Sequence, residues 1–333
     1  MVPLRPLGVG EILDGAVTTI RRNPRVMLGL SAAVAIVTQL VGMAVIWVVL
    51  GEAATLDELN RELTADEALD FLGTTLGGIG ILLFVTWVGT VFLTGMLTVV
   101  VGRAVIGQDL NLSETWQHAK PRLPRLFGLT IVYTLVWSGA IWAVMIGTFV
   151  LAAGGNSGGA ISLLVFGMLA AGLLGIWLYV RFALATPALM LETTTAGRER
   201  PQPIGIVEAL RRSNHLVRNS WWRVFGILLL VLVIVFIVAQ VINVPFSLPA
   251  TLGDGDLFTM TGMSFGALVI STLGSVVSAT ITAPFSAGAT ALLYVDRRIR
   301  AEALDIELAR AANVQLPERP EGYGPGGIPP GPQ

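Results

Sequence analysis

The chain has 333 residues, of which 54% are hydrophobic and 13% are charged, and its mean hydropathy is +0.75. These values lie outside the usage of soluble domains and are typical of a membrane protein. The absence of cysteine and the presence of only 2 histidines exclude a disulfide framework, thiolate chemistry and a histidine-rich metal site. We therefore expect no metal, no cofactor and no nucleic-acid partner.

Six segments are long and apolar enough to cross a membrane, because about 20 helical residues span roughly 30 Å of hydrocarbon. They are predicted at Val26–Leu50, Thr75–Val101, Leu126–Ala153, Ala160–Leu191, Val224–Ala250 and Phe265–Val295. Lipid-exposed backbone must satisfy its own hydrogen bonds, so the predicted class is an all-α polytopic membrane protein. The first span follows a charged segment and does not resemble a cleaved signal peptide, so it should remain as an anchor.

Basic residues predict the orientation of these spans. Of the 21 lysines and arginines, all except Arg61 and Arg181 lie in the N-terminal segment, the second and fourth linkers, or the C-terminal segment. The positive-inside rule then places both termini in the cytoplasm. The acidic linker at residues 52–70 lies on the opposite face, where two capping-box patterns predict one or two short surface helices.

Amphipathic segments are predicted before the first, third and fifth spans. In the first, Leu7, Ile12, Ala16 and Ile20 make an apolar stripe that ends at Asn23-Pro24. Similar patterns precede the third span in "NLSETWQHAKPRLPRLFGL" and the fifth in "IGIVEALRRSNHLVRNSWWRVFGILLL". We expect each to form a cytoplasmic interfacial helix.

These segments predict an internal threefold pattern in which each surface helix feeds a two-span hairpin. The pseudo-repeats would cover about 7–106, 110–191 and 202–300. Successive copies enter the membrane in the same direction, which disfavours an inverted-repeat transporter. The alternative is that any cytoplasmic approach to a membrane collects basic residues and an amphipathic turn. Residues 1–313 are predicted to form a single membrane domain, and residues 314–333 a disordered Pro/Gly-rich cytoplasmic tail.

Three stretches carry a family resemblance: "EALRRSNHLVRNSWWRVFGILLL", "VRFALATPALMLE" and "LRPLGVGEILDGAVTTIRRNP". They resemble the bacterial glycerophosphoryl diester phosphodiesterase membrane-domain-like family and, more loosely, the YciC-like integral membrane proteins. The resemblance spans about residues 4–300 and implies a six-helix domain in the bacterial cell membrane. It transfers no catalytic residue, because phosphodiesterase chemistry in such relatives belongs to a separate soluble barrel.

Four polar residues inside or near the spans are candidates for lipid or ligand contact. Arg181 lies in an apolar run too long to be fully immersed, so it either snorkels to the interface or is buried, where it could attract an anionic head group. Gln39, Gln240 and Asn243 favour interhelical hydrogen bonds, with a polar pathway as the alternative.

The sequence predicts a non-enzymatic membrane scaffold that organises membrane lipids, including anionic lipids, or partner proteins. Intramembrane acids, histidines and metal ligands are not clustered as catalysis would need. The Gly155–Gly159 match to a nucleophile elbow lies in a Gly-rich hairpin on a face that has no histidine, whereas this motif requires a strand, a sharp turn and a helix with a histidine partner. The alternative is a transporter or lipid-handling protein that uses the Arg181 region.

Overall fold

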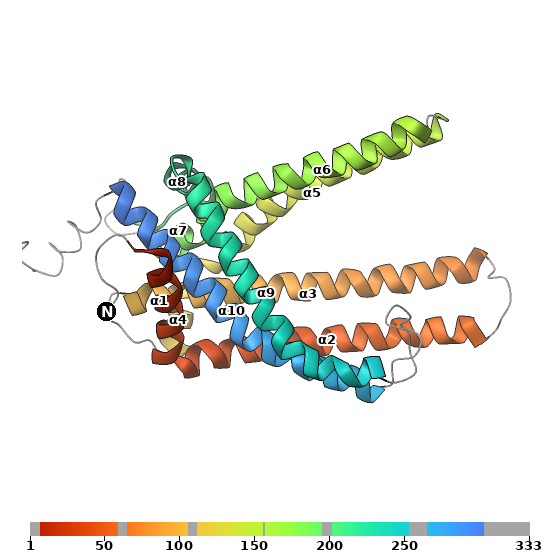
Figure 1. Ribbon diagram of the computed structural model, residues 1–333, viewed down its shortest axis with the longest axis horizontal. Coiled ribbons are helices and arrows are strands. Elements are labelled where there is room, and N and C mark those ends of the chain that lie inside the picture. Colours follow the sequence, from red (N-terminus) through yellow and green to blue (C-terminus); the bar gives the residue numbers. More distant parts are fainter. Residues whose placement is uncertain are drawn as a thin grey trace, which may run out of the picture.

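The computed structural model describes residues 7–58, 65–105, 112–155, 157–194, 202–252 and 265–302. These residues are helical apart from turns and one antiparallel pair of two-residue strands, β1 (Thr193–Thr194) and β2 (Gln202–Pro203). The helices are α1 (Val9–Arg22), α2 (Pro24–Glu58), α3 (Ala65–Val105), α4 (Leu112–Ala119), α5 (Leu123–Ala153), α6 (Ser157–Phe182), α7 (Ala185–Leu191), α8 (Ile206–Arg218), α9 (Trp221–Leu252) and α10 (Phe265–Glu302) (Figure 1).

Six stretches of the described chain are long and apolar enough to cross a membrane. They are Pro24–Val48, Leu69–Val105, Leu123–Ala153, Gly158–Leu191, Trp221–Ser247 and Phe265–Ala301. This is the make-up of a multi-pass membrane protein, and it confirms the predicted all-α class with six spans.

The fourth predicted span is divided in two. Helix α6 ends at Phe182, Ala183 and Leu184 form a turn, and α7 begins at Ala185. Pro187 explains the break, because in a continuous helix its ring would clash with the carbonyl group four residues earlier, at Ala183. Because α6 ends at Phe182, Arg181 lies in the last helical turn of α6.

The acidic linker differs from its prediction. Helix α2 continues to Glu58 and α3 begins at Ala65, so most of this segment extends the two membrane helices instead of forming separate surface helices. Residues 59–64 lie outside the described residues. The first capping-box pattern, Thr55-x-x-Glu58, falls inside α2, because the first span continues with good helix formers such as Ala, Leu and Glu. The second pattern, Thr64-x-x-Glu67, coincides with the start of α3 at Ala65. The predicted tail at residues 314–333 is also outside the described residues.

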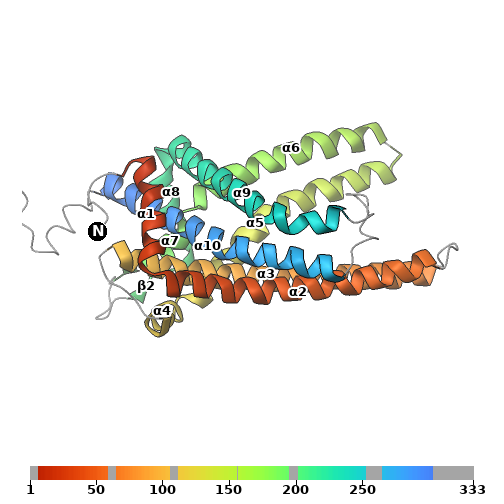
Figure 2. The same cartoon turned by 60° about the horizontal axis from the view of Figure 1, so that its bottom comes forward.

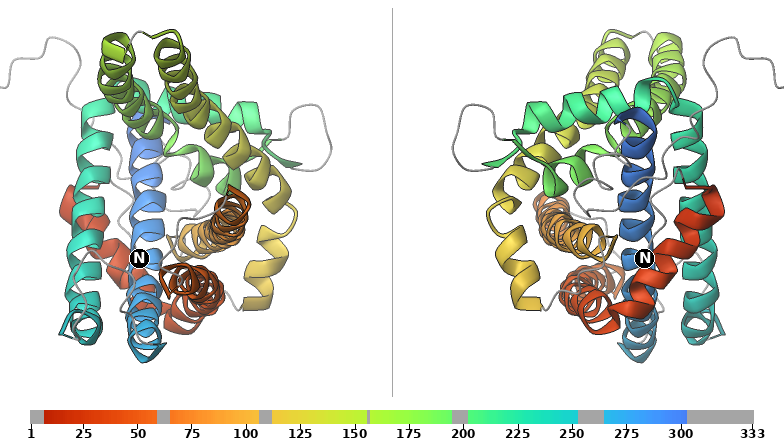
Figure 3. Two further views of the ribbon diagram at one scale, coloured as in Figure 1. Left: turned by 90° about the vertical axis from the view of Figure 1, so that its right-hand side faces the viewer. Right: turned by 90° about the vertical axis from the view of Figure 1, so that its left-hand side faces the viewer.

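The long helices form three hairpins, α2 with α3, α5 with α6 and α9 with α10. The hairpins meet at one end of the molecule and diverge toward the other (Figures 1 and 2). Helix α10 packs against α1, α2, α3 and α9, while α5 and α6 pack mainly against each other. The end-on views in Figure 3 show α10 between α9 and the α2–α3 pair, with the α5–α6 hairpin to one side.

Close contact between α9 and α10 depends on Gly274. A Cβ atom added there would lie 2.6 Å from Cβ of Phe246, which is shorter than real Cβ contacts. The absent side chain therefore lets the two helices approach closely. At the α5–α6 turn, Gly155 has φ of +78°, a conformation that suits glycine because it has no Cβ.

Short helices precede three of the spans and pack against the protein itself. Helix α1 buries Ile12, Ala16 and Thr19 and lies against α10, and α8 buries Ala209, Ser213, Leu216 and Val217. The first junction falls at Asn23, and α2 begins at Pro24 as expected. At the third junction, the hydroxyl group of Ser220 is buried without a hydrogen bond, so it does not cap the fifth span. That these helices are interfacial, and that the three units are a repeat, stay predictions.

The core lies at the end where the hairpins meet. Its largest fully buried side chains include Tyr294, Met190, Leu189 and Leu97. Toward the other end the helices expose large apolar side chains, and Phe149 and Phe166 are 74% and 72% exposed. In a membrane protein such exposed apolar side chains can face hydrocarbon.

Candidate functional site

Positive charge is concentrated at the end of the bundle where the hairpins meet, which we call the basic end. It is formed by α1, α4, α7 and α8 and by the adjoining ends of the six long helices (Figure 1). Within the described ranges, every lysine and arginine belongs to one of these elements or to the turns between them. The basic end is therefore the surface of the described residues at which anionic molecules would be attracted most strongly.

Asp296 of α10 holds the start of the chain against the basic end. Its carboxylate is fully buried, and Oδ1 accepts hydrogen bonds from the backbone N–H of Leu7 at 2.9 Å and from Nε of Arg300 at 2.8 Å. Arg223 of α9 approaches Oδ2 at 3.5 Å. Arg223 and Arg300 also donate to the carbonyl oxygen of Leu7, at 2.9 and 3.0 Å. This group, the Asp296 clamp, joins the N-terminal segment, α9 and α10.

Glu192 forms a second buried cluster just after α7. It accepts two hydrogen bonds from Nε of Arg212 on α8, the shorter at 2.8 Å, and one from the hydroxyl group of Tyr294 on α10. Arg298 lies 4.0 Å from the same carboxylate. Because a buried carboxylate is stable only when it is paired and hydrogen-bonded, this Glu192 cluster fixes the position of α7 and α8 relative to α10.

Arginines crowd one another beside α4. Nη2 of Arg103 donates a hydrogen bond to Nε2 of His118 at 3.4 Å, and the turn between α4 and α5 contributes Arg122. Burial and the nearby guanidinium groups of Arg103 and Arg125 lower the pKa of Arg122 below its usual range. Positive charges held this close attract anions, and phosphate groups are the anions for which arginine is best suited.

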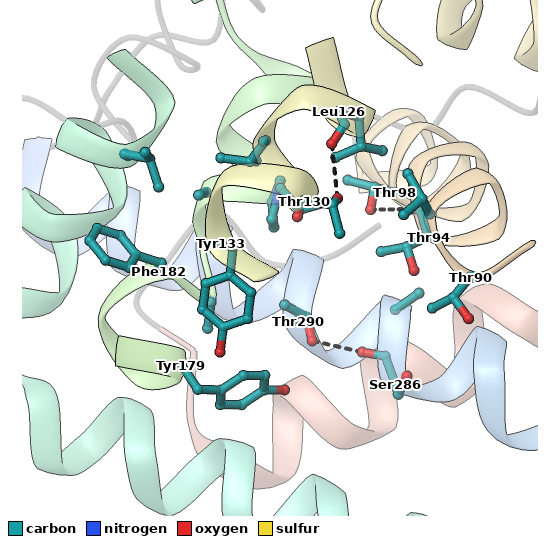
Figure 4. A pocket seen from close by; sticks show the side chains of 18 residues that line it. Thr90, Thr94, Thr98, Leu126, Thr130, Tyr133, Tyr179, Phe182, Ser286 and Thr290 are labelled. Atoms are coloured by element: carbon teal, nitrogen blue, oxygen red, sulfur yellow. Dashed lines mark hydrogen bonds between the residues drawn. The ribbon is translucent and has the colours of Figure 1, made fainter. Parts of the chain in front are cut away.

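A cavity of about 360 Å³ lies between α3, α5, the α6–α7 turn and α10. Figure 4 shows Tyr133 and Tyr179 close together, with threonines of α3 on one side and Ser286 and Thr290 of α10 on another. None of its lining residues is charged, and the lining combines hydroxyl groups with aliphatic and aromatic side chains. It is therefore suited to a neutral molecule, and it is chemically distinct from the basic end.

The four predicted contact residues do not form one site. The guanidinium carbon of Arg181 lies 4.4 Å from the centre of the Trp177 ring, and the backbone carbonyl of Arg181 accepts a hydrogen bond from Ser213. Gln39 is half-buried on α2, and Gln240 is exposed on α9. Asn243 donates to the carbonyl oxygen of Ala239 in its own helix, at 2.8 Å, and not to a neighbouring helix. None of the four lines the cavity, although Tyr179 and Phe182 on either side of Arg181 do.

Sequence reasoning did not single out Glu192, Asp296 or the two cavity tyrosines. One signal was available for the acids, because each stands directly beside a long apolar run and on the basic side of it. The cavity had no comparable signal. Its hydroxyl groups come from segments that are far apart in the chain. Each segment by itself has the sequence pattern of an ordinary membrane span.

The fold and the charge distribution define an all-helical membrane protein with six candidate spans. A model of the DUF7847 family, a domain of unknown function, matches residues 7–297, and the chain belongs to this family. Searches of curated proteins and of solved structures found no match. Nothing in these comparisons supports the resemblance to the phosphodiesterase membrane-domain-like or YciC-like proteins.

Proposed function

We propose that the protein is a non-enzymatic membrane scaffold that gathers anionic lipids around its basic end. The observation that carries this proposal is that the described cations all belong to one end of the bundle, while the described acids of that end are fewer. A basic residue near the bilayer surface contributes about 1 kcal/mol to the attraction of anionic lipids. The charge distribution therefore favours binding of phosphate-bearing head groups without any reaction.

The proposal includes an orientation and an architecture. The basic end would face the cytoplasm of a bacterial cell, as the positive-inside rule predicts. The order of a short helix followed by a hairpin, found three times along the chain, supports the three pseudo-repeats and an origin by triplication. The motif resemblance to the phosphodiesterase membrane-domain-like family would then be one of shared architecture.

The Asp296 clamp and the Glu192 cluster support the scaffold in a second way. They hold α1, α7 and α8 against α10 with buried, hydrogen-bonded carboxylates. A surface held in this way presents its arginines in a fixed pattern, which reduces the entropy lost when a lipid or an acidic partner protein binds.

Lipid retention after mild extraction tests the proposal. The full chain is reconstituted in nanodiscs with equal amounts of phosphatidylglycerol and phosphatidylcholine, and the retained lipids are measured by native mass spectrometry. The triple variant Arg103→Gln, Arg122→Gln, Arg125→Gln should lose most of the enrichment in phosphatidylglycerol. The variant Ser162→Ala, at a polar position of α6 away from the basic end, is the control. Equal retention of both lipids by the unmodified protein would contradict the proposal.

The cavity favours a second candidate function, a lipid-handling or transport protein. It lies beside the α6–α7 turn, where two of its lining residues flank Arg181. Movement of a labelled lipid between leaflets of reconstituted vesicles distinguishes this function from a static scaffold. If Arg181 guides an anionic head group, Arg181→Gln should slow that movement and lower anionic-lipid retention. If both are unchanged, Arg181 has no part in either function.

A further inference from the structure

No arginine of the basic end lines the cavity between α3, α5, the α6–α7 turn and α10. The ligand that binds in the cavity can therefore differ from the anionic lipids proposed for the basic end. The cavity volume of about 360 Å³ holds part of a lipid-sized molecule but not the whole of one. The remaining part of a lipid-sized ligand must therefore extend out of the cavity.

Two stripes of hydroxyl groups face the cavity. Thr90, Thr94 and Thr98 recur every four residues on α3, and Ser286 and Thr290 have the same spacing on α10. Residues four apart lie on one face of a helix. The hydroxyl group of Thr98 donates to the carbonyl of Thr94 at 2.7 Å, and that of Thr290 donates to the carbonyl of Ser286 at 2.8 Å. Their oxygen lone pairs remain able to accept hydrogen bonds from a ligand.

The two tyrosines supply the donors. Tyr133 of α5 and Tyr179 of α6 lie next to each other at the cavity, and within the described residues neither hydroxyl group makes a hydrogen bond. Tyr179 is 53% exposed on α6, among exposed apolar side chains such as Leu173 and Ile176. A hydroxyl group in an apolar environment is costly unless it finds an acceptor. These two groups therefore point to a ligand with carbonyl or ether oxygens.

The absence of charge from the lining selects against ionic ligands. A phosphate or carboxylate would lose its hydration and gain no countercharge from the 18 lining residues. A neutral molecule with ester carbonyls and a free hydroxyl group matches both the tyrosine donors and the threonine acceptors.

Apolar side chains continue from the cavity along the diverging hairpins. Leu83 and Phe84 on α3 are each 64% exposed, as is Leu135 on α5. Leu83 and Phe84 lie about two helical turns from Thr90, and Leu135 about half a turn from Tyr133, toward the end where the hairpins separate. This surface can cover acyl chains that leave the cavity.

We infer that the cavity binds the ester and hydroxyl region of an uncharged two-chain glycerolipid of the diacylglycerol type, with Tyr133 and Tyr179 donating hydrogen bonds to the ester carbonyls. This site goes beyond the proposed scaffold function and does not depend on it, because it involves none of the cations that would bind anionic lipids.

Photo-crosslinking tests the inference. The full chain in phosphatidylcholine nanodiscs is titrated with a photoactivatable diacylglycerol, and the labelled peptides are mapped. We expect labelling in α3, α5 or α10 near the cavity. The double variant Tyr133→Phe, Tyr179→Phe should weaken binding about 5- to 100-fold, as expected for two lost hydrogen bonds. Thr148→Val, which removes a hydroxyl group from α5 outside the cavity, should bind as the unmodified protein does.

Two further measurements keep the result interpretable. Tyr179→Phe alone changes an exposed side chain and should leave thermal stability unchanged while weakening binding. Phosphatidic acid with the same acyl chains should compete at least tenfold less well than the neutral lipid. Unchanged binding by the tyrosine variants, labelling elsewhere, or equal competition by phosphatidic acid would overturn the inference. Enrichment of phosphatidylglycerol at the basic end should be the same in the tyrosine variants, so failure here is distinguishable from failure of the proposed function.

Discussion

Replacing Asp296 with alanine should be among the most damaging single changes in the protein. The substitution leaves the buried backbone N–H of Leu7 without an acceptor, which costs about 1–3 kcal/mol. It also removes the carboxylate that neutralises Arg223 and Arg300, and breaking a buried ion pair typically costs about 3–5 kcal/mol. Both arginines are about one-third exposed, so water offsets part of this loss. We expect a net destabilisation of about 3 kcal/mol.

The measurement is reversible unfolding in mixed micelles, followed by tryptophan fluorescence. Asp14→Ala, on the exposed side of α1, serves as the control and should change the free energy of unfolding by less than about 0.5 kcal/mol. Amide hydrogen exchange should also show faster exchange at the start of α1 in the Asp296 variant. A loss below about 0.5 kcal/mol with unchanged exchange in α1 would refute the reasoning. Asp296→Asn keeps an acceptor for Leu7 and should be less damaging.

Three further predictions concern other parts of the molecule. Glu192→Gln should destabilise the protein by about 1–3 kcal/mol in the same unfolding assay, since it leaves the guanidinium group of Arg212 beside a neutral amide. Gly274→Leu should cost about 1–3 kcal/mol because its side chain would overlap Phe246, whereas Gly80→Leu, with open space around it, should be neutral or nearly so. Because the chain has no cysteine, single cysteines report topology directly. A cysteine at Gln117 should be labelled only from the cytoplasm and one at Gly154 only from outside, and the reverse result would contradict the proposed orientation.

The class and the spans could be predicted because they depend on local composition. A run of about 20 apolar residues has few stable structures in a membrane protein other than a spanning helix. The junction at Asn23-Pro24 was predictable for the same reason, since proline restricts its own position and the residue before it. The division of the fourth span was anticipated only in part, from the length of the run.

The contacts between distant segments could not be predicted. The Asp296 clamp joins residues at opposite ends of the described chain, and no pattern near Leu7 indicates that its backbone will meet α10. The same applies to the cavity, whose lining residues come mainly from α3, α5, α6, α7 and α10 and are far apart in the chain. Arg181 drew attention as a charge in an apolar run, but its neighbour Tyr179 lines the cavity, because helix rotation decides which of two nearby residues faces inward.

The bond between Leu7 and Asp296 also sets an order of events during biogenesis. The two residues are 289 positions apart in the chain. At about 5–20 residues per second, a ribosome would need roughly 15–60 s after making Leu7 before it reaches Asp296. Throughout that interval α1 lacks the helix on which it rests, so the newly made N-terminal segment must wait at the membrane, accessible to chaperones and proteases, until the last helix has been inserted.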